Sequence, residues 1–147
     1  MITNMHKPIM VKEVSSYLDN DKELSILDCT FGGGGHTLSF LELGHRVTAI
    51  DEDLKAQEIA KEFRSKFNKF NFYKINFKDF EKIDDDCVKN KFDFILLDLG
   101  FSSNQLDDVQ IGISFKENSK LNMNYLNSGL TAYDIINNYS EKDLSRI

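Results

Sequence analysis

The feature of this sequence best suited to binding a ligand is a run of four glycines, Gly32–Gly35, followed by His36. The run lies between a buried-strand pattern that ends in Asp28–Cys29–Thr30 and a helical pattern that begins at Thr37. Glycines let the backbone turn sharply and approach a ligand without side-chain clashes, and the helix behind them offers unpaired N–H groups. We therefore expect a loop that holds a nucleotide-type cofactor; the alternative is a flexible turn.

The spacing of the glycines discriminates between classes of cofactor. A dinucleotide site requires the pattern G-x-G-x-x-G. Counted from Gly32 the third glycine would fall at Thr37, and counted from Gly33 it would fall at Leu38, so the pattern fails. This disfavours a nicotinamide-dependent oxidoreductase and leaves the methionine end of S-adenosylmethionine as the expected ligand of the loop.

An acid after the second strand pattern is a candidate for the sugar of the cofactor. Asp51 lies about twenty residues beyond the loop, where a carboxylate can accept hydrogen bonds from a ribose. Asp53 is the lesser candidate, because its position fits the N-cap of the following helix. Together, the glycine loop and Asp51 favour an adenosine-containing ligand.

A second acid follows the fourth strand pattern. Asp98 comes directly after the apolar run Phe92–Leu97, and ligands of open α/β sheets bind at the carboxyl ends of the strands. We expect Asp98 to accept hydrogen bonds from the amino group of the cofactor or from an amine being methylated; the alternative is a cap on the next turn. Ser102, Ser103 and Gln105 follow on the same loop and are expected to complete the pocket.

Strand patterns alternate with helical patterns along the chain, which predicts an α/β fold with a parallel sheet covered on both faces. Strands are expected over Ser25–Thr30, His45–Ile50, Phe70–Phe77 and Phe92–Leu97. Helices are expected over Val11–Leu18, Thr37–Leu43, Leu54–Phe67, Thr131–Asn137 and Glu141–Ile147, with a long loop from Ser102 to Asn127. Four parallel strands make only half of a doubly wound sheet. The fold is therefore predicted to be truncated after the fourth strand, either as a fragment or as a chain completed by another.

Composition narrows the classes of protein to consider. The chain has 147 residues, 41% of them apolar and 29% charged, which fits one soluble globular domain. Its net charge of −6 argues against a self-sufficient nucleic-acid binder. No membrane span or signal peptide is recognisable, and Cys29 and Cys87 are expected to be reduced thiols in a cytosolic or organellar-matrix protein. Of these two locations, we expect the cytoplasmic one. The three scattered histidines do not form a metal site.

Four blocks of sequence occur in an order that is similar to one known family. They are His6–Val14, Asp28–His36, Leu96–Leu106 and Gly112–Phe115. This set resembles the RsmH (MraW) family, which methylates the exocyclic amine of a cytidine in the decoding region of small-subunit ribosomal RNA. The family is longer, with an inserted helical domain and further strands. The resemblance therefore implies that residues 1–147 are the N-terminal part of a Rossmann-like methyltransferase domain.

The resemblance also implies a cofactor, S-adenosyl-L-methionine, and a set of site residues. The residues implied to bind the cofactor are Gly34, Gly35, His36, Asp51, Phe77, Asp98 and Gln105. The loop would hold the methionine end, the acid after the second strand the ribose, and the aromatic side chain that ends the third strand would pack near the adenine. Asp98 is the implied catalytic residue, as a hydrogen-bond acceptor for the amine and not as a dedicated base.

Several positions depart from the family pattern. They are Gly33, Asn104 and Ile111, where the family usually has Arg, Pro and Arg, together with Ile113, Asn122 and Asn124. The lost charges lead to a second hypothesis, a degenerate or truncated S-adenosylmethionine-binding module without turnover. For an active enzyme the implied partner is small-subunit ribosomal RNA or the ribosomal subunit, with no membrane. A homodimer or a completing chain is the other expected partner.

Overall fold

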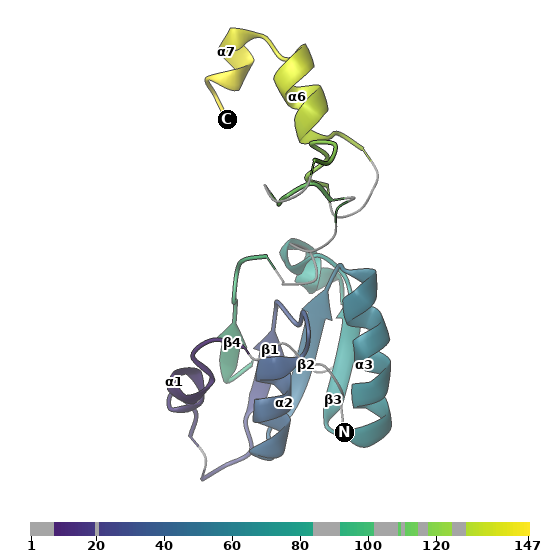
Figure 1. Ribbon diagram of the computed structural model, residues 1–147. Coiled ribbons are helices and arrows are strands. Elements are labelled where there is room, and N and C mark those ends of the chain that lie inside the picture. The colour runs from purple at the N-terminus through teal and green to yellow at the C-terminus, as the bar shows by residue number, and fades with distance from the viewer. Residues whose placement is uncertain are drawn as a thin grey trace. The chain divides into compact units, whose positions relative to one another are not determined.

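The computed structural model describes residues 8–19, 21–83, 92–101, 109, 111–114, 118–124 and 129–147. The chain divides into two compact units, Met1–Leu99 and Gly100–Ile147. Within the described residues, the first unit contains a four-stranded sheet with its helices, and the second contains two short helices (Figure 1).

The sheet of the first unit is parallel throughout, as the sequence predicts. Its strands are β1 (Ser25–Asp28), β2 (Arg46–Asp51), β3 (Phe70–Lys74) and β4 (Phe94–Leu96). They lie in the order β3-β2-β1-β4. The chain therefore moves outward from β1 to β3 and then returns to the other side of β1. This reversal between β1 and β4 is the switch point at which open α/β sheets bind ligands.

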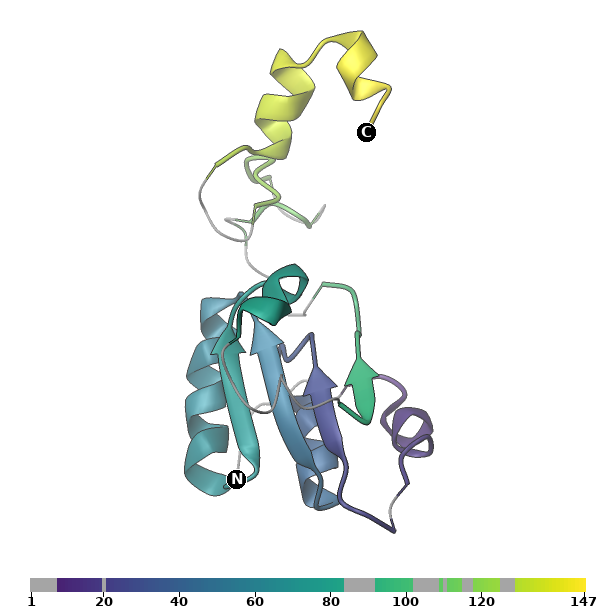
Figure 2. The same ribbon diagram turned by 180° about the vertical axis from the view of Figure 1, so that it is seen from behind.

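One face of the sheet carries the two main helices, α2 (Gly35–Glu42) and α3 (Leu54–Lys66) (Figure 1). A strand–helix–strand connection is right-handed, so two successive connections running in one direction place both helices on the same face. The short α1 (Val11–Ser15) lies beside β4. A 3₁₀ helix, η1 (Phe77–Lys82), follows β3; among the described helices, no other lies on the opposite face (Figure 2).

The main core lies between the sheet and its two helices. Its buried members from the strands are Ile26, Val47, Ala49, Phe70 and Phe72, and those from the helices and their connections are Phe31, Phe40, Leu41, Ala56, Ala60 and Phe63. Phe31 meets Phe63 edge-on, with ring centroids 5.3 Å apart. Burial of large aromatic rings contributes heavily to core stability, so these contacts fix α3 and the loop after β1 against the sheet.

The opposite face has a smaller apolar cluster of Leu27, Cys29, Ile50 and Ile83. Cys29 is buried, as the strand pattern predicts. Burial raises the pKa of its thiol to about 11, and the neighbouring Asp28 adds to the shift. The thiol is therefore protonated at neutral pH and serves as a small apolar filler.

The fourth strand is less buried than the sequence predicts. Phe94 and Leu96 are half-buried, Ile95 is 53% exposed, and Leu97 lies beyond the end of β4. Within the described residues β4 pairs only with β1, so it forms an edge of the sheet. Its apolar run matches a central strand, whereas among the described residues no further strand pairs with its outer edge.

The ends of several elements also differ from expectation. α2 begins at Gly35, two residues before the predicted start, because Gly34 adopts a left-handed conformation and acts as the N-cap. β3 ends at Lys74, so Phe77 begins η1 and does not end the strand. α1 is shorter than the predicted Val11–Leu18. Asp84–Asp86 lie outside the described residues.

The second unit contains α6 (Ala132–Asn138) and α7 (Glu141–Leu144). The predicted N-caps are confirmed: Thr131 forms a capping box with Asp134, and the Ser140 hydroxyl accepts the Asp143 N–H. Among the described residues, no helix has the length and apolar content needed to cross a membrane.

Candidate cofactor site

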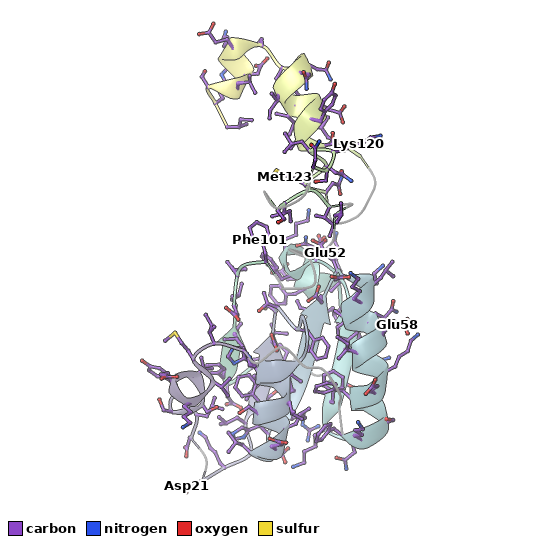
Figure 3. The ribbon with its side chains drawn as sticks, in the orientation of Figure 1. Asp21, Glu52, Glu58, Phe101, Lys120 and Met123 are labelled. Atoms are coloured by element: carbon purple, nitrogen blue, oxygen red, sulfur yellow. The ribbon has the colours of Figure 1, made fainter. Side chains whose placement is uncertain are left out.

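The candidate residues lie at the carboxyl ends of the strands. The glycine loop follows β1, Asp51 ends β2 and Asp98 follows β4. Figure 3 marks the two ends of the sheet: Glu52 lies at the carboxyl end, beside Asp51 in sequence, and Asp21 lies at the opposite end. The parallel topology therefore gathers at one edge the residues that the sequence separates.

The glycine loop requires glycine for two physical reasons. Gly32 and Gly34 have φ angles of +51° and +78°, in the left-handed region that glycine adopts most easily. A Cβ atom on Gly34 would also lie 2.6 Å from Cζ of Phe63 and 2.9 Å from Cζ of Phe31. The tight turn is closed by a 2.7 Å hydrogen bond from the Gly34 N–H to the Phe31 carbonyl. Core packing thus fixes the loop, which excludes the flexible turn.

The loop ends in the amino terminus of α2. No side chain of the described residues caps this helix at Gly34, so the N–H groups of its first turn, from Gly35 and His36 onward, are not satisfied by a side-chain cap. Such N–H groups and the helix dipole favour an anionic ligand group. The α-carboxylate of a bound amino acid moiety has the required charge.

Asp51 supports the loop and still has acceptor capacity. Its Oδ2 accepts the Gly32 N–H at 2.7 Å, and its Oδ1 accepts the Asp53 N–H at 2.9 Å. Burial raises the pKa of Asp51 above its ordinary value, and the two N–H bonds partly oppose that rise. A carboxylate has about four acceptor positions, and a backbone hydrogen bond from Glu52 also lowers the pKa of Asp51, so the group retains acceptor capacity for a sugar.

Asp53 caps α3 through a 2.8 Å bond from the Lys55 N–H, as predicted.

Phe77, which the resemblance places near the adenine, begins the 3₁₀ helix η1 and does not end a strand. Asn76 caps η1 and donates to Oε2 of Glu52 at 3.0 Å, which ties η1 to the end of β2. Phe77 is 40% exposed, so its ring is available for a ligand at this edge.

Asp98 lies across the switch point from the glycine loop. Its side chain is 42% exposed, and its Oδ2 lies 3.6 Å from Nε2 of His36, whose side chain is 7% exposed. The backbone N–H of Asp98 donates to Oγ1 of Thr30 at 2.8 Å. The structure thus brings together His36 and Asp98, which lie far apart in the sequence.

Three further residues of this site, Asp28, Thr30 and Thr37, were not predicted from the sequence. Asp28 is 1% exposed; its Oδ2 accepts the Thr37 hydroxyl at 2.7 Å, and its Oδ1 accepts the Thr30 N–H at 3.1 Å. Burial raises the pKa of Asp28, and these hydrogen bonds oppose the rise. The available signal was an acid at the end of a buried strand, with hydroxyl residues two and nine positions later.

Other predicted pocket residues are not tested. Ser102, Ser103 and Gln105 lie outside the described residues. Among the residues that the structure describes, no cluster of His, Cys, Asp and Glu could hold a metal ion.

The parallel sheet, the glycine loop at its switch point and the acid that ends β2 together define a Rossmann-like methyltransferase fold. A model of the MraW methylase family matches residues 3–147. The chain belongs to this family.

Known relatives match along nearly the whole chain. It is 38% identical over 144 residues to ribosomal RNA small subunit methyltransferase H of Brachyspira hyodysenteriae, covering 97% of this chain and 47% of that protein. It is 42% identical over 149 residues to the protein of the same name from Caldicellulosiruptor saccharolyticus, covering 97% and 48%. The chain therefore spans about half the length of the curated relatives it matches.

Proposed function

We propose that this chain binds S-adenosyl-L-methionine and, with it, methylates the exocyclic amine of a cytidine in small-subunit ribosomal RNA. One observation carries the proposal: Asp51 and Asp98 both contact the segment around the glycine loop, Asp51 through Gly32 and Asp98 through His36. This segment therefore lies between two acceptors and in front of an uncapped helix. Relatives named as small-subunit ribosomal RNA methyltransferases support the choice of substrate.

The residues of the site fit the groups of the cofactor. The first-turn N–H groups of Gly35 and His36 would bind the methionine carboxylate, Asp51 would accept the ribose hydroxyls, and Phe77 would pack near the adenine. We also assign Gln105 to this pocket from the family resemblance. The bound cofactor supplies an electrophilic methyl group on a sulfonium.

Asp98 would act on the amine. Its exposed carboxylate can accept a hydrogen bond from the cytosine amino group and so orient the nitrogen lone pair. Holding the two reactants in line contributes a large part of the rate acceleration in such a transfer. The target base must leave its stack to reach the edge of the sheet. An enzyme with this substrate works where ribosomes are assembled, so we propose a cytoplasmic location.

A second candidate function is cofactor binding without turnover. It is favoured by Ile111, which stands where the family usually has Arg and is 9% exposed. Its carbonyl accepts the Met123 N–H at 2.7 Å, so this position is packed inside the second unit and presents no charge to RNA.

Transfer of a radioactive methyl group to small ribosomal subunits that lack the modification distinguishes the two functions. The protein from Caldicellulosiruptor saccharolyticus serves as the positive control. We expect label in the RNA with this chain, and loss of the label in Asp98→Ala. Cofactor binding without label, in an assay where the control is active, would establish the second function.

A further inference from the structure

Thr30 lies between the two halves of the proposed site. Its hydroxyl accepts the Asp98 N–H at 2.8 Å, and its own N–H donates to Oδ1 of Asp28 at 3.1 Å. Neither contact is needed to form a strand, because β1 ends at Asp28 and β4 ends at Leu96. Thr30 therefore links the ends of the two strands that border the switch point.

The bond from Asp98 continues the β1–β4 ladder with a side chain. The last backbone bond of the ladder runs from the Cys29 N–H to the Leu96 carbonyl at 2.9 Å. In a regular parallel ladder the Asp98 N–H would next donate to the Cys29 carbonyl. The Thr30 hydroxyl takes the place of that acceptor. The backbone of Asp98 is thus held beyond the point where the strands cease to pair.

Thr30 is itself held by a buried acid. Asp28 is 1% exposed and accepts both the Thr30 N–H and the Thr37 hydroxyl, and Thr37 is 0% exposed. Thr37 stands next to His36 in α2, and Nε2 of His36 lies 3.6 Å from Oδ2 of Asp98. The contacts form a closed ring from β1 through α2 to the residue after β4, so each member restrains the others.

The other surroundings of Asp98 offer little restraint. Its neighbours in sequence, Leu97 and Leu99, are 48% and 66% exposed. Nδ1 of His36 has no hydrogen-bond partner among the described residues, whereas its Nε2 lies within ion-pair distance of the Asp98 carboxylate. The imidazole can orient the Asp98 carboxylate, whereas the Thr30 hydroxyl holds its backbone.

From this ring we infer that Thr30 is a positioning residue: its hydroxyl fixes Asp98 at the distance from the glycine loop that binding of the cofactor and the acceptor amine requires. The inference rests on the proposed function of Asp98. It adds to that function a residue, Thr30, that positions Asp98 and need not touch either ligand.

The test compares Thr30→Val, which keeps the shape but removes the hydroxyl, with Thr30→Ser, which keeps the hydroxyl. Affinity for S-adenosyl-L-methionine is measured by calorimetry on this chain and in an Asp98→Ala background. Loss of one hydrogen bond predicts about a three- to tenfold weaker affinity in Thr30→Val, with Thr30→Ser within about twofold of the original. In the Asp98→Ala background the effect of Thr30→Val should vanish. An equal loss in both backgrounds, or no loss at all, would overturn the inference.

Hydrogen exchange of the Asp98 amide, followed by NMR in the cofactor-free chain, tests the same bond without any ligand. We expect faster exchange in Thr30→Val and unchanged exchange in Thr30→Ser. If the original chain bound no S-adenosyl-L-methionine, the proposed function would fail, and this measurement would still decide whether Thr30 holds Asp98. Unchanged exchange in Thr30→Val would show that it does not.

Discussion

At the scale of single residues, the site is built from carboxylates that are held by backbone N–H groups. Asp51 accepts from Gly32 and Asp53, and Asp28 accepts from Thr30 and from the Thr37 hydroxyl. These bonds fix the orientation of the carboxylates while burial raises their pKa values. The protonation state of the site is therefore expected to change at a higher pH than for an exposed aspartate.

The affinity for the cofactor should change with pH as the carboxyl group of Asp51 titrates. Its ionised carboxylate is the stronger acceptor for the ribose, so affinity is full above its raised pKa and is lost as the pH falls through that value. In Asp51→Asn the affinity at neutral pH should fall about tenfold or more. Calorimetry between neutral and mildly acidic pH checks both expectations.

The Asp51 charge also helps to raise the pKa of Asp28, so Asp28 should titrate at a lower pH in Asp51→Asn than in the original chain. Loss of affinity that persists at neutral pH, where an aspartate is ionised, therefore belongs to Asp51. Asp53→Asn is the matched control, since asparagine also caps helices. Affinity in Asp51→Asn that matches the original chain at every pH would remove Asp51 from the ribose site.

Cys29 should be unreactive in the folded chain. Burial raises the pKa of its thiol to about 11, so the thiolate that reacts with disulfide reagents is scarce. In a Cys87→Ser background, which leaves one thiol, we expect reaction at mildly alkaline pH to be slower than in the unfolded chain by about two orders of magnitude. Similar rates in the folded and unfolded chain would contradict the buried position of Cys29.

At the scale of elements, the glycine loop depends on the packing of α3. The phenyl ring of Phe63 fills the space beside Gly34, and the same ring packs on Phe31 in the loop. The shape of the cofactor loop is thus part of the hydrophobic core. The sequence pattern alone does not predict the contact between Phe63 and the loop, because that contact depends on which face of the sheet α3 covers.

Gly34→Ala should therefore destabilise the chain more than Gly44→Ala. Both glycines have positive φ angles, +78° and +91°, so each alanine costs about 1–2 kcal/mol in conformation. Only at Gly34 does the new Cβ meet a ring, at 2.6 Å, which adds about 1–3 kcal/mol of overpacking. Urea unfolding of both variants checks the difference, and equal losses of stability would show that the loop does not pack as described.

The elements also show what the sequence could and could not predict. Alternating strand and helix patterns predicted the parallel sheet, the loop after β1 and the acid at the end of β2, because these depend on local periodicity. The start of α2 was wrong by two residues, because a glycine run has no propensity that marks a helix. Phe77 was placed in a strand because the apolar alternation continues to it, whereas β3 ends at Lys74 and Asn76 then caps η1.

At the scale of the whole molecule, β4 is an edge strand of the described sheet, with no further described strand paired to its outer edge. Ile95 is 53% exposed on a strand whose sequence matches the interior of a sheet. The curated relatives are about twice as long as this chain, which covers 47% and 48% of two of them. The predicted homodimer or completing chain stays a prediction.

The closed ring of contacts through Thr30 and Asp98 shows why the site residues were easier to predict than the residues that position them. Asp51 and Asp98 follow strands and could be recognised by position. Thr30 acts through a contact with a residue far along the chain, and only the parallel pairing of β1 with β4 brings the two together. Such contacts can be predicted only when the order of the strands in the sheet is known.

Calorimetric titration of this chain at neutral pH with S-adenosyl-L-methionine and, separately, with NAD tests the central claim most directly. The glycine spacing, the uncapped start of α2 and Asp51 predict one molecule of S-adenosyl-L-methionine per chain, with NAD at least about tenfold weaker. Binding of NAD as tight as that of S-adenosyl-L-methionine, or no binding of S-adenosyl-L-methionine at all, would contradict it.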